Sequence, residues 1–201
     1  MRPYQTMTDG EGNEVALFPM EYLHVSNTEH QLYAIDFWGW NASGRVYACP
    51  CYAPFTGEVV YTGNDHNMIF WSTNKVRFVD GTLDYATILV AHSDTAPAIV
   101  GSVMSQGSLW YHTGNYGFST GDHLHIECAR GHVMWDGSGQ HLATPYHLYN
   151  MLACNDTIID DGEGYDWRDY NAPAPTKKEK KNFPWFILAN KRRNLYRNVR
   201  W

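Results

Sequence analysis

From Leu17 onward the sequence consists of short apolar runs separated by Gly, Asn and Pro, and this spacing limits the possible folds more than any other feature. The clearest run, YATILVAH at 85–92, is rich in β-branched residues. Closely spaced strands with turn residues between them are typical of antiparallel sheets. We therefore expect a mainly β protein, an antiparallel sheet or sandwich with little helix. The expected strands are 34–38, 58–61, 67–71, 75–79, 85–92 and 122–128, and one short helix is expected at 146–152.

Composition divides the chain into four segments. Residues 1–16 are polar and predict an N-terminal arm, 17–152 hold the apolar runs and predict the main domain, and 153–172 form an acidic, Gly-rich extension. Residues 173–201 are a Pro-Ala linker and a basic, aromatic tail, with nine of the 15 basic residues and one acid. The rest of the chain then has six basic and 20 acidic residues, a net charge of −14. An acidic body with a basic tail indicates two functional parts.

The sequence predicts neither a signal peptide nor a membrane-spanning segment. The opening MRPYQT has no apolar h-region, so no signal peptide is predicted. The best membrane-spanning candidate, 183–189, is far too short. We expect a protein that stays in a cytoplasm or leaves by a route that needs no signal, such as a phage particle or host lysis. The four cysteines are expected to be small buried thiols, because Cys-x₂-Cys pairs are absent: Cys49, Cys51, Cys128 and Cys154.

The run STGDHLHIE at 119–127 has the strongest chemical signal. Side chains alternate between the faces of a strand, so His123 and His125 should point the same way, about 7 Å apart. One imidazole can then bind a metal while the other meets a water or a substrate oxygen. Glu127 shares this face and could hydrogen-bond to a metal ligand without binding the metal itself, although a surface acid is an equally good interpretation.

Two other segments offer partners for these histidines. His30 comes just before an expected strand, and Asp36 lies inside it between apolar neighbours. A carboxylate there is costly unless a cation or hydrogen-bond donors compensate it. His92 ends the apolar run 85–91. The alternative for each of these residues is an ordinary structural role.

With these residues in place, the sequence resembles the lysostaphin/LytM family of zinc endopeptidases. That family has a His and an Asp early in the chain, an isolated His midway and a closing S-T-G-x-H-L-H-x-E strand. The chain departs from it in spacing His30 and Asp36 as His-x₅-Asp instead of His-x₃-Asp, and the extra residues could bulge before the strand. The similarity is greatest to the C-terminal endopeptidase domains of the tail-knob wall-degrading proteins of small short-tailed phages. It rests on FPM at 18–20, AIDF at 34–37, TGDH at 120–123 and GYDW at 164–167.

The resemblance implies one zinc ion per chain, bound by His30, Asp36 and His125. It implies that His92 and His123 are catalytic, orienting a water, taking its proton and stabilising the oxyanion. The implied substrate is the peptide cross-link of bacterial peptidoglycan. The implied location is the phage virion, at the tail tip, or the host cytoplasm before lysis.

Two alternatives to this function stay open. The first is a catalytically inactive LytM-like module that binds the cell wall or serves as a structural part of the phage tail. The second is a zinc hydrolase of host peptides. The basic tail 177–201 could bind wall polymer or a membrane surface, dock onto phage tail proteins, or be a flexible end, and we prefer docking or wall binding. We expect no nucleic-acid partner.

Overall fold

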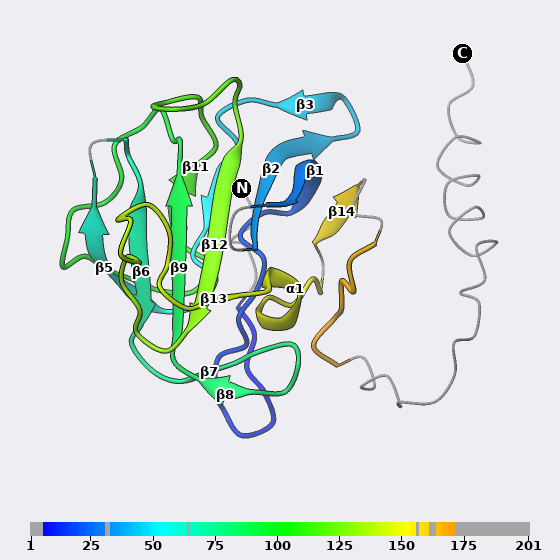
Figure 1. The fold of residues 1–201 in the computed structure, drawn as a ribbon. Coiled ribbons are helices and arrows are strands. Elements are labelled where there is room, and N and C mark those ends of the chain that lie inside the picture. Colours follow the sequence, from blue (N-terminus) through cyan, green and yellow to red (C-terminus); the bar gives the residue numbers. More distant parts are fainter. Residues whose placement is uncertain (1–5, 31–32, 64, 156, 161–163, 172–201) are drawn as a thin grey trace, which may run out of the picture.

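The computed structural model describes residues 6–30, 33–63, 65–155, 157–160 and 164–171 (Figure 1). Strands dominate this part of the chain, and its one helix has a single turn, which confirms the mainly β prediction. The elements are β1 Tyr22–His30, β2 Ala34–Asn41, β3 Gly44–Val46, β4 Pro50–Tyr52, β5 Gly57–Thr62, β6 Met68–Ser72, β7 Val76–Arg77, β8 Leu83–Asp84, β9 Ala86–Ala91, β10 Val103–Met104, β11 Leu109–His112, β12 Leu124–Arg130, β13 Pro145–Tyr146, α1 Leu148–Met151 and β14 Ile158–Asp160.

Ten strands form one sheet, in which eight follow the order β10-β5-β6-β9-β12-β2-β1-β14, while β13 pairs with β12 and β3 with β2. All of these pairs are antiparallel except β1 with β14. Two small antiparallel pairs, β4 with β11 and β7 with β8, complete the strands. Figure 1 shows β12 running between β9 and β2 through the middle of the sheet. Residues on β12 can therefore meet side chains from both β2 and β9.

Most predicted strands lie within a few residues of the observed ones. The largest difference is at 75–79, where only β7 pairs as a strand. The chain turns there: the N–H of Phe78 donates to the carbonyl oxygen of Thr82, and the N–H of Val79 donates to the carbonyl oxygen of Met151. A second difference is at β12, which begins at Leu124 and continues to Arg130. The predicted short helix is confirmed as α1.

One face of the sheet carries the main hydrophobic core. On β2, Ile35 and Phe37 point into this core, while Asp36 points to the opposite face. On β12, Leu124 and Ile126 repeat this alternation. Large apolar side chains from β11, α1 and the segment 18–20, together with Cys51 of β4, cover the core face. Burial of this apolar surface is the main favourable contribution to folding.

The opposite face has two parts, which we call the open half and the capped half. The capped half is the surface around Ile69, Leu89, Glu127 and Ala129, and the capping loop, residues 131–144, covers it. Leu142 of this loop is fully buried and completes a second small core there. The open half lies around Asp36, Ala91 and His125 and borders a cleft.

The predicted segment boundaries stay predictions. Val15 and Ala16, at the end of the predicted arm, are fully buried, and β14 of the predicted extension pairs with β1. The basic tail lies outside the described residues. Within the part of the chain that the structure describes, no helix is long and apolar enough to cross a membrane.

Candidate metal and catalytic site

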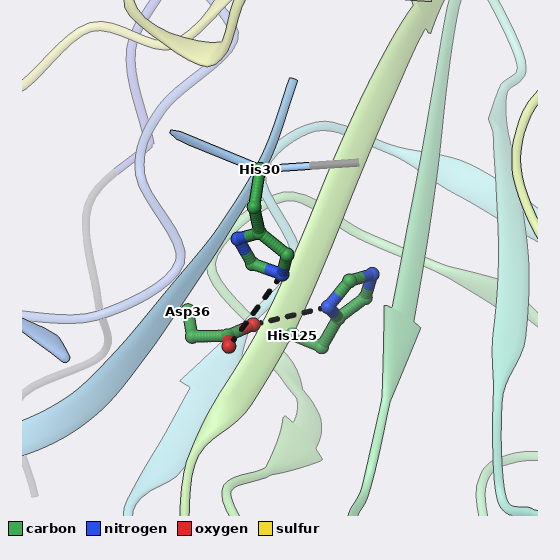
Figure 2. A group of neighbouring side chains, drawn as sticks. All are labelled: His30, Asp36 and His125. Atoms are coloured by element: carbon green, nitrogen blue, oxygen red, sulfur yellow. Dashed lines mark hydrogen bonds and ion pairs between the residues drawn. The ribbon is translucent and has the colours of Figure 1, made fainter. Parts of the chain in front are cut away.

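Asp36 is the centre of a group of three side chains on the open half. The register of β2 and β12 places His125 directly opposite Asp36, and His125 Nδ1 lies 3.0 Å from Asp36 Oδ1. His30 Nε2, at the end of β1, lies 3.7 Å from Asp36 Oδ2. Figure 2 shows the carboxylate between the two imidazole rings. The structure thus brings together the three residues predicted to bind zinc.

The unusual spacing of His30 and Asp36 is accommodated by a hairpin. His30 is the last residue of β1 and pairs with Ala34, the first residue of β2. The register of β1 shifts on both sides of Asn27, so the strand is irregular before it reaches the site. Tyr33 follows with a φ of 69°, in the left-handed region. The pairing of β1 with β2 therefore brings His30 to the same end of the sheet as Asp36.

The geometry of this group fits a zinc ion. Zinc takes imidazole nitrogen and carboxylate oxygen at about 2.0–2.2 Å, so in a tetrahedral site two ligand atoms are about 3.4 Å apart. The two separations from Asp36, 3.7 Å to His30 Nε2 and 3.0 Å to His125 Nδ1, lie on either side of that value. The three ligand atoms all lie within 4.8 Å of one another. Three protein ligands leave a fourth position for water or substrate, as in catalytic zinc sites.

His92 and His123 lie beside this group, with ring centroids 4.7 Å apart. His92 Nδ1 lies 3.0 Å from the carbonyl oxygen of Tyr116, and His123 Nδ1 lies 2.7 Å from that of Gly121. A carbonyl oxygen can only accept, so each Nδ1 carries the hydrogen and each neutral ring keeps its lone pair on Nε2. His123 Nε2 is 3.8 Å from Asp36 Oδ1, so it faces the group of three. Both imidazoles can therefore accept a proton at the site.

The backbone holds these two rings in place. His92 follows β9 with a φ of 80°, a left-handed conformation that costs energy in a residue with a side chain and often occurs at functional sites. His123 pairs with Gly114 in an isolated antiparallel β-bridge, and the backbone of Gly114 lies close to that of Asp94. A Cβ at Gly114 would lie 2.3 Å from the nitrogen of Asp94, so only glycine fits there. Asp122 fixes the start of β12 by accepting hydrogen bonds from the Thr113 hydroxyl and the Ala48 N–H.

Glu127 is a fully buried residue of the capped half, so its interpretation as a surface acid is wrong. Its Oε1 lies 3.2 Å from His125 Nε2 and 2.7 Å from His141 Nδ1, and its Oε2 accepts a bond from the Leu142 N–H. No sequence motif singles out His141, and no spacing rule links it to β12. The capping loop alone brings it to Glu127.

The charges of this group shift the pKa values in opposite directions. Burial would raise the pKa of Asp36, but its hydrogen bond with His125 and the nearby histidine charges hold it below its usual value. Burial would lower the pKa of His125, but hydrogen bonds to Asp36 and Glu127 raise it to about 9. Burial lowers the pKa of His92, so that ring is neutral at neutral pH. In the metal-free site, a protonated His125 therefore neutralises part of the charge of the two carboxylates.

The open half forms the floor of a cleft with a volume of about 730 Å³. Its walls come from the loop 117–120, the segment around Asp65 and Asn67, and the capping loop at 139–141. Phe118 on the rim is 98% exposed. The cleft is open to solvent and brings the five predicted site residues together: His30, Asp36, His92, His123 and His125.

Comparison with known proteins gives relatives of two kinds, although no family model matches the chain. The chain is 30% identical over 179 residues to morphogenesis protein 1 of Bacillus phage B103, and the match covers 82% of this chain and 47% of that protein. It therefore spans about half the length of that curated relative.

Two solved structures are also similar. The catalytic domain of lysostaphin, an antimicrobial peptidase of Staphylococcus simulans, has 17% identity and a TM-score of 0.41, covering 72% of this chain and 88% of that chain. A zinc-containing peptidase from Vibrio cholerae has 15% identity and a TM-score of 0.40, and the match covers 60% of this chain and 39% of that chain. The similarity to a phage protein that the sequence motifs indicated is confirmed.

Proposed function

We propose that this chain is a zinc endopeptidase that cleaves the peptide cross-links of bacterial peptidoglycan in the service of a phage. One observation carries the proposal. Asp36, His30 and His125 form a set of zinc-type ligands, and two further imidazoles, which carry their hydrogen on Nδ1, line the same cleft. A purely structural zinc site is closed by four protein ligands and has no need of such neighbours.

In this proposal His30, Asp36 and His125 hold the zinc ion. Zinc supplies Lewis acidity, which lowers the pKa of water towards 7 and polarises a carbonyl group. His123 Nε2 accepts the proton of the attacking water and later returns it to the leaving amine. His92 Nε2, held by the Nδ1–H bond to Tyr116, accepts a hydrogen bond from the water and orients it.

The wall substrate and the phage setting are inferred from the relatives. Lysostaphin is an antimicrobial peptidase, and morphogenesis protein 1 belongs to a Bacillus phage. A cross-linked wall peptide is an extended chain, and the cleft at the site is open to solvent. We place the protein in the virion, at the tail tip, or in the host cytoplasm before lysis. The tail 177–201 would then dock it onto phage tail proteins or bind wall polymer.

A second function is favoured by the name of the phage relative. A morphogenesis protein can serve in assembly, so the chain could be an inactive LytM-like module that binds the wall or forms part of the tail. The two functions differ in the need for His123. A structural module would keep its role without that imidazole, whereas the peptidase would not.

The test is release of new free amino groups from purified cell-wall sacculi. The protein is assayed as purified, after chelation, and after zinc is restored, with His123→Ala as a variant that keeps all three proposed ligands. We expect release that stops with chelator, returns with zinc and is lost in His123→Ala. If the folded, zinc-loaded protein releases nothing from sacculi of several cross-link types, the structural module is the better explanation.

A further inference from the structure

Glu127 is a charged residue of β12 whose side chain has no exposed surface. A buried carboxylate is tolerated only when it is paired and hydrogen-bonded. Glu127 has three partners: His125, His141 and the N–H of Leu142. Two of the three come from the capping loop. The loop therefore does more than cover apolar surface, since it also compensates a charge next to the proposed metal site.

The partners of Glu127 determine which nitrogen of His125 is free. An ionised carboxylate can only accept hydrogen bonds, so His125 Nε2 and His141 Nδ1 both carry a hydrogen when they contact Oε1. With its Nε2 hydrogen held there, His125 can bind a metal only through Nδ1. Nδ1 is the nitrogen that faces Asp36, at 3.0 Å. An imidazole whose other nitrogen donates to a carboxylate is the usual arrangement behind metal-bound histidines.

We propose that His141 is a positioning residue of the metal site, which acts through Glu127 to fix the ring of His125 with Nδ1 towards Asp36. This inference rests on the proposed zinc site. His141 reaches Glu127 only through the fold of the capping loop, so the loop and the metal site are coupled. Loss of His141 removes the shorter of the two bonds to Oε1 and leaves the buried carboxylate free to turn away from His125.

The same three residues could instead bind a second metal ion, since the ligand atoms of His125, Glu127 and His141 lie within 4.8 Å of one another. Two observations favour the positioning role. A second ion would require His125 to bridge two metals through both of its nitrogens. The 2.7 Å separation between His141 and Glu127 is also an ordinary charge-assisted hydrogen bond, which needs no ion.

The experiment measures zinc binding and is independent of peptidase activity. Zinc content is determined by elemental analysis and the zinc dissociation constant by chelator competition. The proteins are the unmodified chain, His141→Ala, His141→Asn and His132→Ala. Asparagine places an amide N–H near the position of His Nδ1, so it should keep the bond to Glu127. His132 lies in the same loop but contacts Trp71 and Ser72, so it is the matched control.

We expect one zinc per chain, and binding about 10–100-fold weaker in His141→Ala, the range for the loss of a group that supports a ligand. Binding should be largely restored in His141→Asn and unchanged in His132→Ala. The visible spectrum of the cobalt-substituted protein should also change in His141→Ala, which a simple loss of stability would not cause.

Three results would overturn the inference. One is equal zinc affinity in His141→Ala and the unmodified chain, and another is no zinc binding by the unmodified chain. The third is two zinc ions in the unmodified chain and one in His141→Ala, which would assign the second metal site instead. A chain that binds one zinc through this arrangement but leaves sacculi intact would contradict only the peptidase proposal.

Discussion

The two halves of the outer sheet face contain similar side chains in different surroundings. In the open half, Asp36 lies among histidines, and 13% of its side chain is exposed to the cleft. In the capped half, Glu127 also lies between two histidines, but its side chain is fully buried. His125 belongs to both groups, with Nδ1 towards Asp36 and Nε2 towards Glu127.

This difference shows how one structural motif can serve two purposes. A carboxylate with access to the cleft can exchange its hydrogen bonds for a metal ion. A carboxylate sealed beneath a loop has no such access, and its contribution is to hold a neighbour in one orientation. The predictions below compare the two halves, beginning with the largest expected effect.

Replacement of Asp36 by Asn should have the largest effect. The amide keeps the shape but loses the charge and one strong ligand oxygen at the centre of the open half. We expect zinc affinity to fall by more than the roughly 100-fold upper range for supporting groups, with amino-group release from sacculi lost in parallel. Glu127→Gln is the matched variant of the capped half, and its zinc affinity should fall by only about 10–100-fold. Equal losses in the two variants would show that the two carboxylates have the same role.

Removal of a proposed proton acceptor should separate catalysis from zinc binding. In His123→Ala, zinc content should be unchanged, because none of the three proposed ligands is altered. Cleavage of sacculi should fall by about 10²–10⁴-fold, the usual contribution of a general base. His92→Ala should behave in the same way. Zinc loss in either variant would move that histidine into the ligand set.

The pKa of His125 predicts how zinc affinity depends on pH. In the metal-free protein this pKa is raised from 6.5 to about 9, so the ring is protonated at neutral pH and zinc must displace that proton. Apparent affinity should therefore rise about tenfold per pH unit up to about pH 9 and then level off. Without metal, the same interaction stabilises the fold fully below about pH 6.5, and this contribution is lost as the pH rises through 9.

Chelator competition between pH 6 and 10 tests this dependence. Glu127→Gln provides the control, since it removes one of the two carboxylates that raise the pKa of His125. Its affinity should level off at a lower pH than that of the unmodified chain. A curve that is flat from pH 7 to pH 9 would show that His125 is already neutral in the metal-free site.

The sequence predicted the open half much better than the capped half. Period-two alternation placed His123 and His125 on one face, and the polar Asp36 between apolar neighbours marked a strand with one exposed side. These are local properties of a strand. The motif resemblance then supplied roles for residues that alternation alone left undecided.

The contacts of Glu127 and His141 depend instead on a loop of 14 residues that folds back over the sheet. Local sequence sets neither the path of such a loop nor the partner of a histidine within it. The pairing of His30 with Ala34 was missed for a related reason, because the register of β1 arises from pairing and not from composition. One signal was available in advance: Glu127 lies on the same strand face as His125, beside apolar neighbours.

The smallest effects on the site should come from two apolar residues, which also give the clearest contrast in stability. Leu142 is fully buried under the capping loop, so Leu142→Ala should lower the free energy of unfolding by about 2–5 kcal/mol. Its backbone N–H can still bond to Glu127, so zinc affinity should change less than in His141→Ala. Phe118 lies on the rim of the open half and is 98% exposed, so Phe118→Ala should change stability by no more than about 0.5 kcal/mol.

Denaturant unfolding of the zinc-loaded proteins, followed by steady-state cleavage of soluble wall fragments, measures both effects. If Phe118 contacts the substrate, Phe118→Ala should raise KM a few-fold, an estimate based on one exposed aromatic contact of about 1 kcal/mol, and should leave kcat unchanged. The opposite pattern, a destabilised Phe118→Ala with a normal KM and a stable Leu142→Ala, would mean that the loop 117–120 supports the fold and that the capping loop is dispensable. The division of this sheet face into an open and a capped half would then be incorrect.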